Sequence, residues 1–147
     1  MAQWVSPVHD RTQSDVNYAI AQIARGINDV EYKGCFNVSD INRIENNVRY
    51  IADRLNVLKY TNTIETKTDW TFYGIPDVTV ITRLINNVQK IINAYYRPAN
   101  SPDLPNTLLT YEQVNALEKM LYMIKHLIDT EENQYRFCGT ITCGEDW

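Results

Sequence analysis

The chain has 147 residues, of which 44% are hydrophobic and 22% charged, and its formal net charge is −4. This length corresponds to one domain that can bury a core, and the composition excludes a globally disordered chain. The acidic balance argues against a general nucleic-acid binder. No apolar run approaches the roughly 18 residues of a membrane span. The start MAQWVSPVHD lacks a secretory signal, so we expect synthesis in the cytosol and no membrane partner.

An extended N-terminal arm, residues 1–11, is the first predicted element, and it contains Trp4. A first helix is predicted from Gln13 to Asn28, because Thr12 can cap it and Asp15 can complete a capping box. Its apolar residues recur at the spacing of one buried helical face. These residues are Val16, Ile20, Ile23 and Ile27.

The clearest helix is predicted from Val38 to Leu58, with Asn37 as its cap and Asp40 completing the box. Its buried face steps by three and four through Ile41, Ile44, Val48, Ile51, Leu55 and Leu58. Residues 59–76 are rich in threonine and aromatics with partial alternation. That pattern predicts a short β-hairpin or an extended arm across the helices.

A third helix is predicted from Val78 to Tyr95 behind the cap Asp77, and a fourth from Tyr111 to Asp129 behind Thr110. Residues 130–147 are predicted to form a non-helical tail. One domain therefore contains an arm, a first helix pair, a second arm, a second helix pair and the tail. The corresponding ranges are 1–11, 12–58, 59–76, 77–129 and 130–147.

Four helices with one apolar stripe each must bury those stripes against one another, so the predicted fold is an all-α four-helix bundle. The helix starts are alike: the run from Ser39 to Glu45 matches the run from Glu112 to Glu118 in its asparagine and glutamate positions. Two similar helix pairs, arising from an internal duplication, explain this likeness. The alternative is that caps and amphipathic faces resemble each other in any helical protein.

No catalytic signature, phosphate-binding loop or metal-ligand spacing occurs, so we expect neither an enzyme nor a cofactor. Glu45 and Glu118 lie beside the apolar stripes, and we expect them to pair with arginine or backbone, since no glutamate has a histidine three residues later. Cys138 and Cys143 form a Cys-Gly-x-x-x-Cys-Gly pattern. Free thiols, a disulfide and a metal site all remain open for it.

Aromatic residues in the arms and the tail are the candidate partner-binding residues, because extended aromatic segments can add to a neighbouring protein. They are Trp4, Trp70, Tyr73, Tyr135, Phe137, Ile141 and Trp147. The alternative is that the arms fold back on their own bundle and close its ends. Aromatic side chains also stack on sugars, so a host-surface or carbohydrate-binding module is a second hypothesis.

Several of these motifs carry a resemblance to a known group of proteins. They are Trp4 with Asp10-Arg11-Thr12, the run Phe36 to Asn47, Lys67-Thr68-Asp69-Trp70 before Ile75-Pro76, Leu109-Thr110-Tyr111 with Asn115, Leu117 and Glu118, and the two Cys-Gly pairs. In these features the chain resembles small structural proteins of Firmicutes phages and prophages that are associated with tails and baseplates. The resemblance implies a non-enzymatic virion component, assembled in the host cytoplasm as a homo- or hetero-oligomer with other virion proteins.

Overall fold

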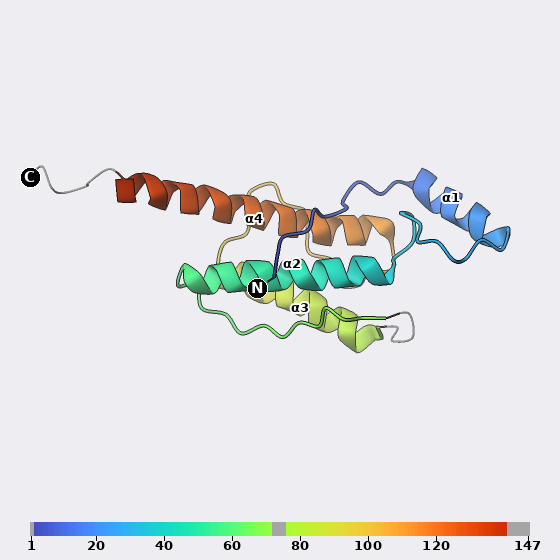
Figure 1. Ribbon diagram of the computed structural model, residues 1–147, viewed down its shortest axis with the longest axis horizontal. Helices are drawn as coiled ribbons and strands as arrows, with labels where there is room; N and C mark the ends of the chain where they lie inside the picture. Colours follow the sequence, from blue (N-terminus) through green and yellow to red (C-terminus); the bar gives the residue numbers. More distant parts are fainter. Residues whose placement is uncertain (1, 72–75, 141–147) are drawn as a thin grey trace, which may run out of the picture.

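The computed structural model describes residues 2–71 and 76–140, with side chains described as far as residue 134. These residues form four helices, α1 (Gln13–Ala24), α2 (Val38–Val57), α3 (Val78–Ala94) and α4 (Tyr111–Thr140) (Figure 1). The predicted all-α class is confirmed. None of the helices in the described ranges combines the length and hydropathy needed to cross a lipid bilayer.

Helix starts follow the predicted caps. Thr12 accepts a hydrogen bond from the backbone N–H of Asp15, whose carboxylate accepts the N–H of Thr12 in return. Asp77 accepts the N–H of Val80 at 3.0 Å. Thr110 and Gln113 form the same reciprocal pair at the start of α4. Three of the four helix starts are therefore fixed by local side-chain chemistry that the sequence spacing predicts.

Helices α2, α3 and α4 enclose one hydrophobic core. Its residues are Ile44, Val48, Ile51, Leu55, Leu84, Ile85, Val88, Ile91, Tyr95, Leu108, Val114, Leu117, Met120, Leu121, Ile124 and Ile128. Almost all lie on the faces predicted from the period of three and four residues. Burial of a side chain of this size contributes roughly 1.5–3 kcal/mol before entropy is counted, so the set is sufficient to hold three helices together.

The three core helices run in the same direction. Arg43 of α2 pairs with Glu118 of α4, and eleven residues further along α2, Arg54 pairs with Asp129. Both partners are therefore met in the same order along the two helices. Each parallel connection needs a return segment as long as the helix beside it, and the described parts of these returns are residues 58–71 and 95–110 (Figure 1).

The predicted β-hairpin in residues 59–76 is not found, since residues 59–71 contain no strand. An extended chain covers about 3.3 Å per residue against 1.5 Å in a helix. Such a segment can therefore return along α2, and its backbone polar groups bond to side chains of α2 and α3 instead of to a second strand.

Helix α1 lies at one end of the bundle, beyond the starts of α2 and α4 (Figure 1), and none of its described side chains belongs to the core cluster. The prediction of four mutually packed helices in two pairs is wrong on this point. Gly26 ends the helix at a φ of +81°, so α1 has 12 residues against 20 in α2, about two turns fewer. Ile27 donates its N–H back to the carbonyl of Gln22. The short stripe stays exposed, with Ile20 60% accessible.

Helix α4 is longer than predicted, because residues 130–140 are helical as well. The predicted non-helical tail is therefore wrong as far as Thr140, and residues 141–147 lie outside the described part. Two glutamates explain the extension: Glu131 accepts hydrogen bonds from tyrosines, and Glu132 accepts them from Arg54 of α2. These contacts hold the turn at which the apolar stripe ends.

Candidate interaction surface

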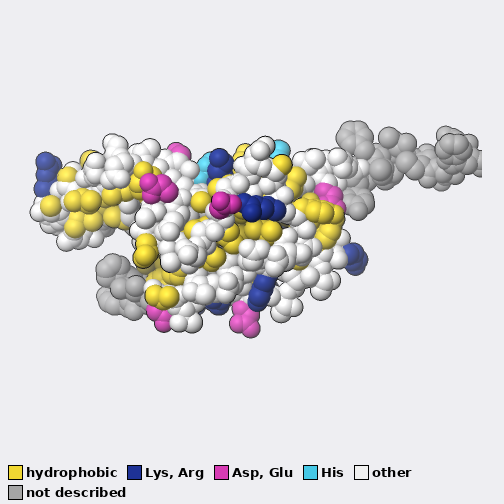
Figure 2. All heavy atoms as spheres, turned by 180° about the vertical axis from the view of Figure 1, so that it is seen from behind, with side chains coloured by type: hydrophobic (Ala, Val, Ile, Leu, Met, Phe, Trp, Pro, Cys, Tyr) yellow, Lys and Arg dark blue, Asp and Glu magenta, His cyan; other side chains and the backbone are white. Residues whose placement is uncertain are grey.

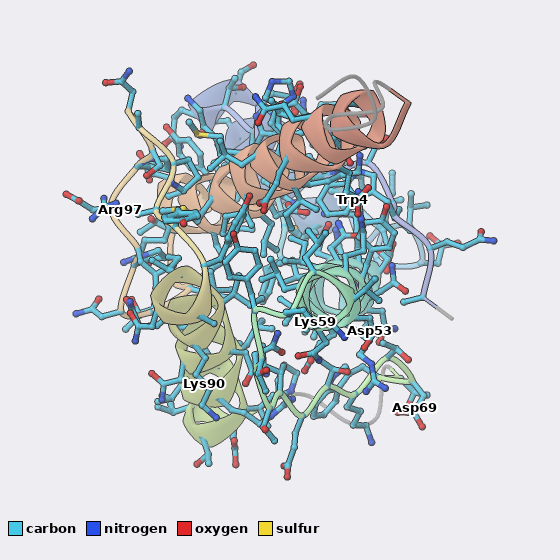
Figure 3. The ribbon with its side chains drawn as sticks, turned by 90° about the vertical axis from the view of Figure 1, so that its left-hand side faces the viewer. Trp4, Asp53, Lys59, Asp69, Lys90 and Arg97 are labelled. Carbon is cyan, nitrogen blue, oxygen red and sulfur yellow. The ribbon has the colours of Figure 1, made fainter. Side chains whose placement is uncertain are left out.

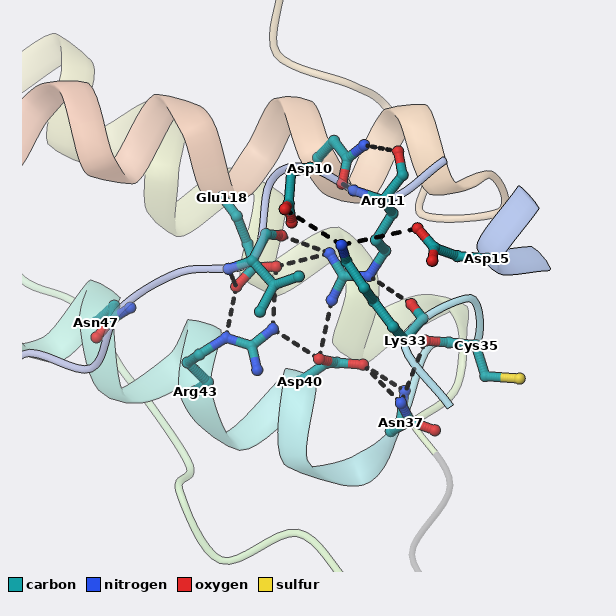
Figure 4. Close-up of polar contacts among 12 residues, drawn as sticks. Asp10, Arg11, Asp15, Lys33, Cys35, Asn37, Asp40, Arg43, Asn47 and Glu118 are labelled. Carbon is teal, nitrogen blue, oxygen red and sulfur yellow. Dashed lines mark hydrogen bonds and ion pairs between the residues drawn. The ribbon is translucent and has the colours of Figure 1, made fainter. Parts of the chain in front are cut away.

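A buried ionic cluster joins the N-terminal arm to α2 and α4 (Figure 4). The guanidinium of Arg11 contacts Asp40 and Glu118, each at 2.9 Å. Arg43 contacts the same two carboxylates, at 2.6 Å and 2.7 Å. Glu118 is fully buried, and Arg11 is only 5% exposed. Two positive and two negative groups therefore balance each other inside the protein.

Mutual pairing is what makes this burial tolerable, because an unpaired buried charge costs several kcal/mol. Burial lowers the pKa of the Arg43 guanidinium, but its hydrogen bonds to Glu118 and Asp40 outweigh that effect and raise the pKa. Both carboxylates of the cluster are engaged by two arginines each. The expectation that Glu118 pairs with arginine and backbone is confirmed, since Val8 also donates its N–H to this carboxylate.

A second cluster joins residues 62–70 to α2 and α3. The fully buried Glu45 accepts hydrogen bonds from the guanidinium of Arg83 and from the backbone N–H of Lys67. Arg83 also donates to the carbonyl of Glu65. The expectation for Glu45 is confirmed in the same way as that for Glu118.

Asparagine side chains hold the backbone of both extended segments. Asn115 accepts the N–H of Arg11 and donates to its carbonyl, and Asn42 does the same with Trp70. Asn47 forms an identical pair with Val5. A side-chain amide has one donor and one acceptor side, so it can replace the neighbouring strand that an extended segment otherwise needs.

These contacts repeat with one spacing. Asn42 and Glu45 of α2 hold residues 70 and 67, and Asn115 and Glu118 of α4 hold residues 11 and 8. In this repeat, α4 with its neighbour α2 corresponds to α2 with its neighbour α3. The contacts do not relate the predicted first helix pair to the second. Arg11 in the first segment therefore corresponds to Trp70 in the second.

Trp4 and Trp70, the two predicted partner-binding residues in the arms, are half-buried against their own bundle. The ring of Trp4, which is labelled in Figure 3, lies 5.7 Å from that of Tyr50, and the Nζ of Lys125 lies 5.4 Å from its centroid. Lys67 lies 4.8 Å from the ring of Trp70. The alternative that the arms fold back is therefore the observed arrangement of these two rings.

The remaining predicted partner-binding residues are not brought together within the described structure. Tyr73, Ile141 and Trp147 lie outside the described residues, and Tyr135 and Phe137 lie on the last turns of α4, where side chains are not described. Their proposed role stays a prediction. The choice between free thiols, a disulfide and a metal site at Cys138 and Cys143 also stays open. Among the described residues, no group of histidine, cysteine, aspartate and glutamate side chains could hold a metal ion.

The described surface contains an open groove of about 980 Å³. It is lined by the end of α1, the α1–α2 loop, the first turns of α2 and α3, and the segment before α4. Most lining side chains are apolar, and two of them project almost fully: Val78 is 81% and Leu109 86% exposed. Hydrophobic side chains gather at the end of the molecule that α1 occupies (Figure 2).

Sequence reasoning missed this groove because it predicted that α1 would bury its stripe. Ile23, expected inside the bundle, instead lines the groove and is 45% exposed. The available signal was Gly26, which stops α1 after twelve residues and leaves it too short to cover α2. No family profile, no curated protein and no solved structure matches this chain.

Proposed function

We propose that this chain is a non-enzymatic structural protein of a phage particle, a tail or baseplate component that binds a neighbouring virion subunit through the apolar groove. The observation that carries this proposal is the exposure of Val78, Leu109 and Ile23 around one hollow. Contiguous apolar surface on a folded protein marks an interaction site more often than a solvated face.

Internal charge pairing supports the scaffold part of the proposal. The buried carboxylates Glu45, Glu118 and Asp40 are all engaged by arginine. They act as structural links and leave the described core without a reactive carboxylate. The phage context comes from the resemblance of the sequence motifs.

Two matched variants test the proposal. Leu109→Lys places a charge in the groove, whereas Val57→Lys places one at a similarly exposed valine that does not line it (72% exposed). We expect Leu109→Lys to reduce incorporation into purified particles about tenfold or more and Val57→Lys to leave it unchanged. Equal incorporation of both variants contradicts the groove as the contact.

A glycan array separates this proposal from carbohydrate recognition. We expect no specific retention of any sugar, since Trp4 and Trp70 each have a lysine over the ring. Specific retention that survives Leu109→Lys favours the second hypothesis. Removal of residues 141–147, which leaves α4 whole, tests the predicted role of the tail separately.

A further inference from the structure

The charged side chains that line the groove are all of one sign. Its lining includes Asp29, Glu31 and Asp77, and no lysine or arginine occurs among the described residues that line it. All three carboxylates belong to exposed residues. A partner that fills the apolar floor therefore brings its flanking groups next to negative charge.

Two of these carboxylates are held in place. Glu31 accepts a 2.5 Å hydrogen bond from the Ser39 hydroxyl at the start of α2, and Asp77 caps α3. Asp29 adjoins Val30, an apolar residue of the groove lining that is 56% exposed. Fixed charges at a rim select a partner more than freely moving ones, because less side-chain entropy is lost on binding.

We infer that the groove takes an apolar segment flanked by lysine or arginine, supplied by another protein of the particle. This inference rests on the proposed function for the groove and adds the chemistry of its partner. The apolar residues of the groove supply the buried contact. Its three acidic residues disfavour the binding of acidic segments.

Cys35 provides a reporter inside the groove. It is half-buried and is one of the residues that line the groove. With Cys138→Ser and Cys143→Ser it becomes the one remaining cysteine of three in the chain. A bound segment should slow the reaction of this thiol with a maleimide.

The experiment uses the full chain and two synthetic amphipathic peptides of about 16 residues that share a leucine face. One peptide carries lysines beside the leucines and the other carries glutamates. We expect the lysine peptide to bind about tenfold more tightly by calorimetry, to lose that advantage in high salt, and to protect Cys35. The double variant Asp29→Asn with Asp77→Asn, which keeps a good helix cap, should bring the two peptides close to equal affinity.

Four outcomes contradict the inference: equal binding of the two peptides, binding of neither, binding that leaves Cys35 unprotected, or concentration-dependent self-association through the groove that no peptide displaces. The first leaves the proposed function standing, since an apolar groove without charge preference can still contact a subunit. Loss of peptide binding together with normal particle incorporation of Leu109→Lys contradicts both.

Discussion

The two extended segments, residues 2–11 and 62–70, lie on similar helix pairs and are held by the same kinds of side chain, yet they differ in how deeply their charges are buried. The arginines that meet Glu118 have side chains 2% and 13% exposed, whereas Arg83, which meets Glu45, is 29% exposed. One architecture thus supports a sealed attachment and a partly solvated one. The difference teaches that asparagine contacts set the path of each segment, while the arginines set how firmly it is held.

The largest effect is expected from removal of the two buried carboxylates. Glu118→Gln leaves Arg11 and Arg43 with only Asp40, so we expect a loss of about 3–5 kcal/mol in the free energy of unfolding. Glu45→Gln leaves Arg83 able to turn towards water, and we expect about 1–3 kcal/mol. Urea denaturation followed by circular dichroism measures both. Equal losses for the two variants contradict the comparison.

The asparagine contacts should matter about equally in the two segments. Asn115→Ala and Asn42→Ala each remove two hydrogen bonds to backbone, which predicts about 1–3 kcal/mol in each case. Hydrogen exchange should accelerate at the amide of Arg11 in the first variant and at that of Trp70 in the second. As a control, Asn115→Asp keeps the acceptor and should preserve most of the protection at Arg11; a fully exposed amide there speaks against the assignment.

Alkaline pH should separate the segments further, because residues 62–70 follow Tyr60, whose hydroxyl donates to Glu131 together with that of Tyr95. The bond to Glu131, and then burial, raise the pKa of Tyr60. Burial, and then the bond to Glu131, raise the pKa of Tyr95. Folded-state pKa values above the unfolded value give stability that is complete below about pH 10 and is lost as pH rises further.

Tyr95→Phe should therefore flatten the decline in unfolding free energy between about pH 10 and 12. Denaturation curves across that range test this expectation, with absorbance of tyrosinate as a second signal. Residues 2–11 contain no tyrosine, so the attachment of this segment serves as the internal reference. An unchanged slope in the variant contradicts the assignment.

The smallest effect concerns the lysines over the two tryptophans. Lys67 is 51% exposed, so Lys67→Met should cost no more than about 0.5–1 kcal/mol. Lys125→Met should cost more, because Lys125 also bonds to Asp129 at 2.6 Å. The same urea titrations rank the two variants, and a larger cost at Lys67 reverses the expected order.

Local features of this fold were predictable from the sequence. The caps Thr12, Asp77 and Thr110 act over three residues, so their spacing is enough to locate helix starts. The core faces of α2, α3 and α4 follow from their periodicity, whereas the periodic face of α1 is exposed. Pairing of Glu45 and Glu118 with arginine was predictable because charged groups beside an apolar stripe need a partner.

Features set by distant contacts were not predictable. Arg11 pairs with Glu118, which lies 107 positions later in the sequence, and the residues next to Arg11 in the sequence do not predict that pairing. The sequence shows that Asn42 and Glu45 have the same spacing as Asn115 and Glu118. That spacing was interpreted as a similarity between helix starts, not as two sites that hold extended segments. The exclusion of α1 depends on how α3 and α4 fill the space around α2 as well as on the stop at Gly26, so the sequence of α1 alone does not predict it. The groove is a consequence of that exclusion.

The long reach of the first ionic cluster has a consequence for biosynthesis. Val8 and Arg11 bond to Glu118 of α4, which lies 110 and 107 positions later in the chain, although Arg11 also meets the earlier Asp40 of α2. At ribosomal rates of about 5–20 residues per second, these residues wait on the order of 5–20 s before Glu118 exists. During that interval the nascent N-terminal segment is open to chaperones or to a copy already made, and the last helix to emerge is the one that ends its exposure.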